Sequence, residues 1–212
     1  MTWSIVAREP ETGHFGIAVA SRFFSVGTLV PHIRPRVGAV ATQAFVNPLY
    51  GIDGVRLMAE GLGPDATIAQ LTSGDNGHRQ RQVHMIDAIG RNAAYTGEAC
   101  VPWCGHLVTE GVSVAGNMLS GPDVIAQTLK VFQATAGKPL VERFLEAMQA
   151  GEDAGGDARG KQSAAIVIYR DEDYPWLEIR ADDHADPLAE LRRLYAVAQE
   201  RFLLFAELMP TR

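Results

Sequence analysis

The sequence predicts an α+β fold in which two antiparallel sheets are stacked between helical layers, a four-layer αββα sandwich. Strand-like segments with a period of two occur in consecutive pairs joined by short turns, which is typical of antiparallel hairpins. Helical segments are grouped separately, with one pair after residue 53, another pair after residue 120 and a long helix at the end. Because strand groups and helix groups stay apart, layers are favoured over a parallel doubly wound sheet. We expect residues 1–212 to form one such domain.

A hairpin is predicted at the start of the chain. Residues 2–8 alternate like a strand that is contacted on both faces, and a turn containing Pro10 and Gly13 follows. Residues 14–20 form the second strand, which has one face of large apolar side chains and one face of glycine and alanine. We expect another backbone layer to approach closely on the small face.

The next segments supply a strand and the first pair of helices. An irregular connection through Pro31 and Pro35 leads to a strand at residues 37–43. Asp53 is the predicted N-cap of a helix that ends near Gly61, and a second short helix follows it.

Strands and helices then follow again in separate groups. Strands are predicted at residues 82–87, 93–96 and 111–117. Ser120 and Asp123 have the spacing of a capping box, so a helix is predicted to begin there. A second helix is predicted at residues 139–148.

The last part of the chain contains a loop, a hairpin and a helix. Residues 150–160 are rich in glycine and charge and are predicted to form a loop. The apolar run within residues 161–169 is typical of a buried central strand, and residues 176–181 are its expected partner. Pro187 suits the first position of the final helix.

The final helix is predicted to be one long element with a buried stripe that includes Phe202 and Phe205. Leu203 and Leu204 add apolar surface beyond what one buried face needs. Surplus of this kind is typical of an interface, so we expect a homo-oligomer.

The composition excludes several classes of function. The chain has 47% hydrophobic and 21% charged residues and a net charge of −6, whereas nucleic acids and membrane surfaces favour basic patches, so neither is an expected partner. No apolar stretch approaches the roughly 18 residues of a transmembrane helix, and Arg8 interrupts the first apolar run, so we expect no signal peptide and a cytoplasmic location. Cys100 and Cys104 lack the partners of a zinc site and are expected to be structural thiols. No metal or cofactor is expected.

Thr2 carries the functional hypothesis. A small residue after Met1 ordinarily allows the methionine to be removed, which leaves a hydroxyl and a free α-amine on one residue. An α-amine has a pKa of about 7.7 to 8.0, so it can accept a proton near neutral pH and activate the hydroxyl of its own residue. Threonine is also a common second residue with no catalytic role.

Seven short sequence blocks, spread in order along nearly the whole chain, together form a recognisable pattern: residues 2–8, 16–22, 38–44, 47–51, 116–119, 154–164 and 182–184. Together they resemble the bacterial and archaeal domain-of-unknown-function family 1028. That family is grouped with the Ntn (N-terminal nucleophile) hydrolases, whose αββα sandwich agrees with the predicted layers. The resemblance implies that Thr2 attacks an amide and forms an acyl-enzyme that water hydrolyses. It implies no particular substrate.

The implied mechanism requires groups around Thr2. Attack creates an oxyanion, and Asn117, at a strand end before a helix, is the first candidate donor, with Gln43 as the second. A strand-end asparagine that only caps a turn is an equally good interpretation. Ser21 and Asp157 are the candidates for orienting the α-amine, since the strand that ends near Ser21 pairs with the first strand.

Substrate binding is assigned to residues of the same blocks. Arg22 and Arg159 are suited to bidentate binding of a substrate carboxylate, although Arg159 is equally suited to pairing with Asp157. Asn47 and Tyr50, from the block at residues 47–51, are also assigned to substrate binding.

Several alternatives stay open. Proteasome-type members use a lysine on a central strand, whereas residues 30–36 offer His32 and two arginines instead. Residues 182–184 have side chains that suit a metal, but a charged turn before the final helix is favoured. The leading hypothesis is a small-amide hydrolase, and its rival is a catalytically inactive Ntn-fold binding or assembly protein. A retained Met1 would favour the rival, because it blocks the amine.

Overall fold

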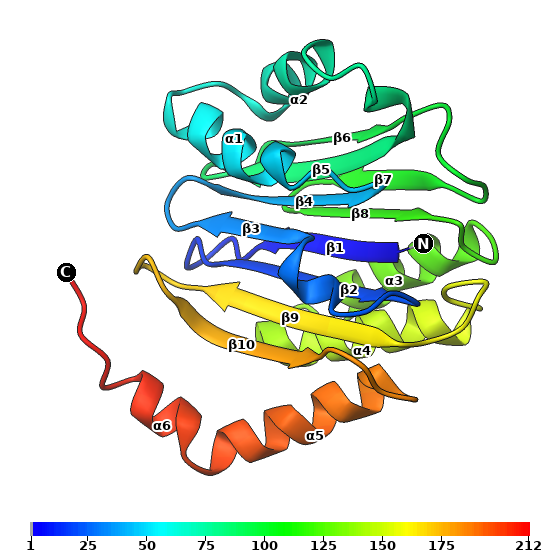
Figure 1. Cartoon of the computed structure of the whole chain (residues 1–212). Helices are drawn as coiled ribbons and strands as arrows, with labels where there is room; N and C mark the ends of the chain where they lie inside the picture. Colours follow the sequence, from blue (N-terminus) through cyan, green and yellow to red (C-terminus); the bar gives the residue numbers. More distant parts are fainter. Residues whose placement is uncertain (1) are drawn as a thin grey trace.

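The structure is a computed structural model that describes residues 2–212, and it contains two antiparallel sheets stacked face to face (Figure 1). The six-stranded sheet has the order β10-β9-β2-β1-β8-β7, and the four-stranded sheet has the order β3-β4-β5-β6. The larger sheet is made of β1 (Thr2–Arg8), β2 (Phe15–Ser21), β7 (Gly105–Thr109), β8 (Val112–Asn117), β9 (Ser163–Tyr169) and β10 (Pro175–Ala181). The smaller sheet is made of β3 (Pro31–Arg34), β4 (Gly38–Ala44), β5 (Arg81–Asp87) and β6 (Asn92–Thr96).

Helices cover the outer face of each sheet, which confirms the predicted four-layer αββα sandwich. The smaller sheet is covered by α1 (Pro48–Ala59) and α2 (Pro64–Ser73). The larger sheet is covered by α3 (Asp123–Ala134), α4 (Leu140–Asp153) and α5 (Pro187–Glu200), and α6 (Phe202–Ala206) follows α5. None of these helices, within residues 2–212, is both long and apolar enough to span a membrane.

The alternation of side chains along β1 determines which layer its first residue faces. Trp3 and Ile5 pack under α3 and α4, whereas Val6 packs between the sheets, so Thr2 and Ser4 also face the smaller sheet. Each fully buried apolar side chain of this kind contributes roughly 1.5–3 kcal/mol to folding. The central position of β1, between β2 and β8, is therefore fixed by packing on both of its faces.

The small face of β2 is approached as predicted, but by a side chain and not by a backbone layer. A Cβ atom added to Gly16 would lie 2.4 Å from the Phe144 ring of α4. The missing side chain at Gly16 therefore makes room for an aromatic ring that anchors α4 on the sheet.

Two strands were not predicted, and both are at sheet edges. β3 occupies part of the segment that we expected to be irregular because of its prolines, and Pro31 is its first residue, where a missing N–H costs least. β7 pairs with β8 at the outer edge of the larger sheet. Edge strands are short and poorly patterned, because only one neighbour defines them.

Three predicted helix boundaries are wrong. α1 begins at Pro48 with Asn47 as its N-cap, whose side chain accepts a hydrogen bond from the Leu49 N–H, so Asp53 lies inside the helix. Ser120 caps nothing, because α3 begins after Pro122 without a side-chain cap. α4 continues to Asp153, so the first four residues of the predicted loop at residues 150–160 are helical.

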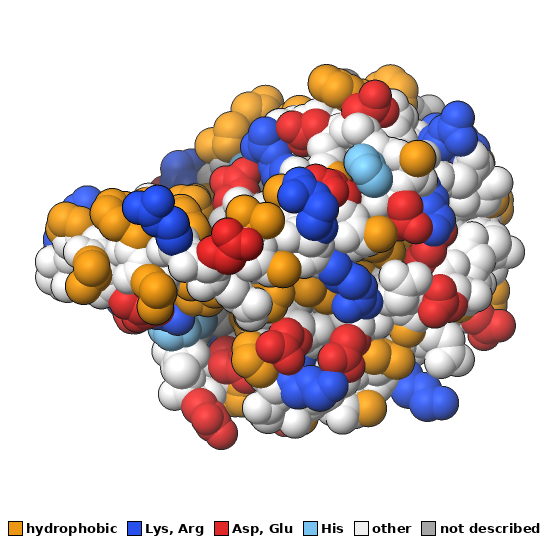
Figure 2. All heavy atoms as spheres, turned by 90° about the horizontal axis from the view of Figure 1, so that it is seen from below, with side chains coloured by type: hydrophobic (Ala, Val, Ile, Leu, Met, Phe, Trp, Pro, Cys, Tyr) orange, Lys and Arg blue, Asp and Glu red, His pale blue; other side chains and the backbone are white. Residues whose placement is uncertain are grey.

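The final helix is also divided, contrary to the prediction. Asp186 and Pro187 start α5 as expected, but the backbone breaks at Arg201, where φ is −146°. Phe202 and Phe205 on α6 are 43% and 63% exposed, so they do not continue the buried stripe. The face shown in Figure 2 carries hydrophobic side chains at its left end, where α6 lies in Figure 1.

Candidate active site

One end of the sandwich gathers the ends of several strands that carry polar residues. Neighbouring antiparallel strands run in opposite directions, so the start of β1 lies beside the ends of β2 and β8. Thr2 is directly opposite Asn117 in this register, and Ser21 is opposite Ser163 at the start of β9. The end of β4, with Gln43, faces them from the smaller sheet, on the side of the N-terminus in Figure 1.

Thr2 lies beside an open cavity. Its side chain is largely buried, with 6% exposed, and its hydroxyl Oγ1 donates a hydrogen bond to Ser21 Oγ at 3.1 Å. Thr2 and Gln43 line a cavity of about 350 Å³, which is within the range of small-ligand sites. The predicted nucleophile therefore combines an oriented hydroxyl with space for a ligand.

A directed chain of hydrogen bonds crosses between the sheets behind Thr2. Ser4 Oγ donates to Gln43 Oε1 at 2.7 Å, so His84 Nε2, 2.7 Å from the same hydroxyl, must be its donor. His84 Nδ1 then accepts from Ser113 Oγ at 3.0 Å. Gln43 Nε2 continues the chain by donating to Gln82 Oε1 at 2.8 Å. One neutral tautomer of His84 therefore satisfies every member of this chain.

Gln82 also connects the chain to Asn117. Asn117 Nδ2 donates to Gln82 Oε1 at 3.0 Å and makes a longer contact of 3.4 Å with the Thr2 carbonyl oxygen. Gln43 Nε2 has both of its protons in short bonds, because it also donates to the Ala115 carbonyl at 3.1 Å. Of the two candidate donors, Asn117 therefore has one N–H in only a long contact, whereas both N–H groups of Gln43 are in shorter hydrogen bonds.

His84 makes stability depend on pH. Burial lowers the pKa of His84 to about 3, with repulsion from His106 adding to the effect, whereas an unfolded histidine titrates near pH 6.5. The unfolded chain alone binds this proton between those values, so stability is present above pH 6.5 and is lost as the pH falls toward 3. We expect the free energy of unfolding to fall by up to about 1.4 kcal/mol per pH unit in this window. Urea unfolding between pH 7.5 and 4.5 measures the slope.

A matched pair of variants isolates the contribution of His84. His84→Gln should make the slope shallower, because glutamine does not titrate. His184→Gln, in an exposed turn, should leave it unchanged. Equal slopes in the two variants would contradict the assignment of the effect to His84.

Asp157 joins the segment that follows β2 to the segment that precedes β9. Its carboxylate is 5% exposed and accepts hydrogen bonds from the backbone N–H of Arg22 at 2.7 Å and of Arg159 at 2.9 Å. The Arg159 guanidinium contacts Asp157 at 3.3 Å, and the Arg22 guanidinium donates to the Arg159 carbonyl at 3.0 Å. Asp157 thus fixes the chain directly after Ser21. Neither arginine is among the residues that line the cavity beside Thr2.

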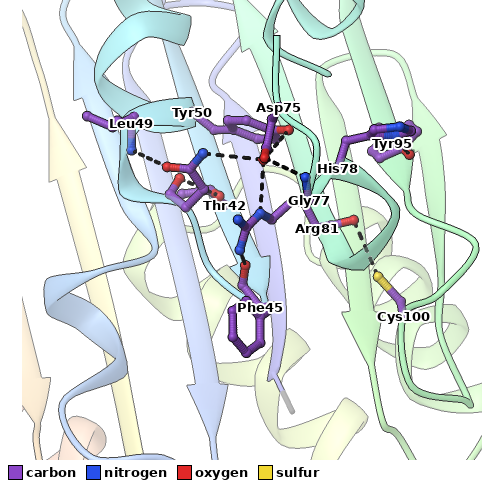
Figure 3. Close-up of polar contacts among 11 residues, drawn as sticks. Thr42, Phe45, Leu49, Tyr50, Asp75, Gly77, His78, Arg81, Tyr95 and Cys100 are labelled. Atoms are coloured by element: carbon purple, nitrogen blue, oxygen red, sulfur yellow. Dashed lines mark hydrogen bonds and ion pairs between the residues drawn. The ribbon is translucent and has the colours of Figure 1, made fainter. Parts of the chain in front are cut away.

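Asn47 and Tyr50 belong to a separate polar cluster around Asp75. Figure 3 shows Tyr50 and Arg81 pointing toward the Asp75 carboxylate. The Asp75 carboxylate accepts from the Tyr50 hydroxyl at 2.9 Å and from Arg81 Nε at 3.0 Å, and Asn47 Nδ2 is 3.5 Å away. Burial acts to raise the pKa of Asp75, but Arg81 and these hydrogen bonds hold that pKa at about 2. Burial and the bond to Asp75 raise the pKa of Tyr50. Neither Asn47 nor Tyr50 lines the cavity beside Thr2.

Arg81 links the Asp75 cluster to the site. Its guanidinium donates to the Phe45 carbonyl and lies 5.4 Å from the centre of the Phe45 ring (Figure 3). Phe45 lines the cavity beside Thr2 and also a neighbouring cavity of about 320 Å³ that Asn117 lines. The cluster therefore supports the ring that stands between the two cavities.

The backbone around these cavities is strained. Among residues 2–212, four residues other than glycine have positive φ. Two of them line the cavities, Ala44 at 70° and Met118 at 53°, and a third, Ser25 at 53°, directly precedes the lining residue Val26. This conformation is uncommon for residues with a Cβ atom, and such strain concentrates at ligand-binding and catalytic sites. The strain is an independent indication that this end of the molecule is functional.

The family comparison agrees with the predicted resemblance. The model of the family of unknown function DUF1028 matches residues 2–191. The chain belongs to the DUF1028 family. A crystal structure of the DUF1028 protein SPO2555 from Silicibacter pomeroyi is similar, with a TM-score of 0.87 and 30% sequence identity over 93% of this chain and 86% of that one. Anbu (ancestral beta-subunit) from Yersinia bercovieri gives a TM-score of 0.48 and 12% identity over 99% of both chains, a level that supports no inference. No curated protein matches.

Sequence reasoning missed the residues at the centre of this DUF1028 protein's polar network. Gln82 and His84 are both 0% exposed, as are Ser4 and Ser113. A signal was present, since Gln82 and His84 alternate along a strand whose other residues are largely apolar. Two polar residues on one face of a buried strand indicate a polar layer between sheets.

The other residues that the sequence singled out lie outside the site. His32 lines a different cavity, and burial lowers its pKa. Residues 182–184 form a turn in which Arg180 pairs with Asp182 at 3.2 Å and His184 Nδ1 accepts from the Asp186 N–H. Within residues 2–212, no group of three or more acidic, histidine or cysteine side chains is placed to hold a metal. Cys100 and Cys104 are free thiols.

Proposed function

We propose that this protein is an Ntn-type amidohydrolase in which Thr2, exposed by removal of Met1, is the nucleophile toward a small amide or peptide-like bond. One observation carries the proposal: the Thr2 hydroxyl, at the first residue of the central strand, is hydrogen-bonded to Ser21 and lines an open cavity. Met1 itself lies outside the residues that the structure describes.

The proposed reaction has two steps. Thr2 Oγ1 attacks the amide carbonyl carbon, and its proton passes to the Thr2 α-amine. The tetrahedral intermediate collapses, the C–N bond breaks, and the amine product leaves with the proton. Water then attacks the Thr2 ester and gives a proton to the α-amine. The acyl C–O bond breaks, the α-amine passes that proton to Oγ1, and the carboxylic acid leaves the restored hydroxyl.

The surrounding residues have distinct proposed roles. Asn117 Nδ2 donates to the oxyanion. Its contact with the Thr2 carbonyl oxygen is long, so this N–H can form a shorter hydrogen bond with the oxyanion instead. Ser21 orients the Thr2 hydroxyl. Asp157 and Gln43 act as positioning residues, because their own hydrogen bonds are occupied by the structure around them.

Labelling with an electrophilic β-lactone tests the proposal. Intact mass of untagged protein should show loss of Met1 and addition of one lactone, and peptide mapping should place the adduct on Thr2. A retained Met1, or a free Thr2 that stays unmodified across neutral pH, would favour the inactive Ntn-fold binding or assembly protein instead.

A further inference from the structure

We infer that the cavity beside Thr2 binds an uncharged, apolar acyl group, so that the protein acts on amides of aliphatic or aromatic carboxylic acids. This inference rests on the proposed function for its chemistry, but the binding preference is a property of the cavity. The preference follows from the chemical nature of the lining, its connection to the core and its rigidity.

The lining of the cavity is almost entirely apolar. Thr2 and Gln43 supply its polar groups, and the other lining residues are Phe23, Val26, Leu29, Val30, Ala44, Phe45 and Val46. Every one of these side chains is uncharged. An acyl group that carries a carboxylate or an ammonium would lose its water here without gaining a partner, which is strongly unfavourable.

The charged side chains of Arg22, Asp157 and Arg159 are bonded to one another or to the backbone, and none of them lines the cavity. Asp157 accepts from Arg22 and Arg159, and the Arg22 guanidinium is bonded to the Arg159 carbonyl. These groups are placed to hold the loops together outside the cavity lining. They leave the acyl-binding space itself apolar.

The deep wall of the cavity is continuous with the core between the sheets. Val26 and Val30 are 3% and 2% exposed and pack in the same cluster as Val6 and Ile17. The rim is formed by Phe23 and Phe45, which are 49% and 70% exposed. Exposed aromatic rings beside an open apolar cavity are suited to closing over an apolar ligand.

The wall is also held in place. Ser163 Oγ accepts from the Val26 N–H at 3.1 Å and donates to the Phe23 carbonyl. Ser25 donates its hydroxyl to Asp182 at 2.9 Å, and its backbone N–H donates to the Asp182 carbonyl at 2.9 Å. A wall anchored in this way to β9 and the end of β10 is preformed, so little binding energy is lost in ordering it.

Binding can be measured separately from catalysis with the full-length Thr2→Ala protein, which lacks the proposed nucleophile but keeps the apolar wall. The probes are N-methylacetamide, N-methylbutanamide, N-methylhexanamide and γ-glutamyl methylamide, with dissociation constants taken from NMR titrations. We expect the Kd to fall about fourfold per added methylene from the butanamide to the hexanamide, the fold-change that corresponds to about 0.8 kcal/mol per buried CH₂. The γ-glutamyl amide should bind at least tenfold more weakly than the hexanamide.

Two neighbouring phenylalanines provide a matched control. Phe23 lines the cavity and Phe24 does not, although both are exposed. In the Thr2→Ala background, Phe23→Ala should weaken hexanamide binding several-fold and Phe24→Ala should leave it unchanged. A Kd independent of chain length, tighter binding of the γ-glutamyl amide, or no binding at all would overturn the inference. Lactone labelling of the Thr2 protein tests the proposed function independently, so the two failures are distinguishable.

Discussion

Replacing Thr2 with alanine should abolish β-lactone labelling and lower kcat for amide hydrolysis by at least about 10³-fold. The reason is that the alanine variant keeps a small second residue and a free α-amine, and it loses only the hydroxyl that is hydrogen-bonded to Ser21. The expected loss therefore reports on Oγ1 alone. Intact mass after exposure to the lactone, and release of amine from the best amide of a panel, measure the two effects.

Thr2→Ser is the matched control, because it keeps an N-terminal hydroxyl within reach of Ser21. We expect it to remain labelled, with the adduct on residue 2. Labelling that persists in Thr2→Ala would contradict the proposal and place the reactive group elsewhere, with the half-buried free thiol of Cys104 as the first group to map.

The layers of the fold were predictable because each depends on local periodicity. Alternation along β1 and β2 gave the hairpin, and the grouping of helices gave the outer layers. Helix ends were less predictable, because several residues competed as caps. Asn47 is followed by Pro48, which satisfies both the cap and the first helical position, whereas Asp53 has only a suitable side chain.

The break in the final helix could not be read from its pattern. Apolar residues continue beyond Arg201 at helical spacing, but the helix breaks at that residue, and α6 exposes Phe205 while Leu203 still packs against the core. Periodicity predicts which side chains share a face only while the backbone stays helical. It contains no information about where the underlying sheet ends.

Some of the predicted site residues lie together because the pairing of neighbouring strands, which is predictable from local periodicity, places them there. Thr2, Ser21 and Asn117 lie at the ends of neighbouring antiparallel strands, so the antiparallel pairing alone places them close together. Asn47 and Tyr50 instead join Asp75, which no local pattern connects to them. Gln82 and His84 were missed because their importance depends on which face of β5 meets the other sheet.

Loss of the Gln82 side-chain amide should strongly destabilise the protein. Its Oε1 accepts from Gln43 and Asn117, and its Nε2 lies within 3.0 Å of Thr96 Oγ1 and of the Gly105 and Gly116 carbonyls. Gln82→Met keeps the length of the side chain and removes all of these bonds. Each buried polar group left unpaired costs about 1–3 kcal/mol, so we expect the free energy of unfolding to fall by on the order of 4 kcal/mol. Guanidinium chloride unfolding measures the change.

Gln70→Met is the control, because Gln70 is exposed on α2 and its replacement should change stability by less than about 0.5 kcal/mol. Gln82→Met should also loosen Asn117, since it removes the 3.0 Å bond that fixes the asparagine amide beside Thr2. If lactone labelling at Thr2 slows while Met1 removal is unchanged, the inter-sheet network positions the site as well as stabilising the fold. A loss of stability under about 1 kcal/mol would mean that the buried partners of Gln82 find other hydrogen bonds, and that the network is not the single unit that its geometry indicates.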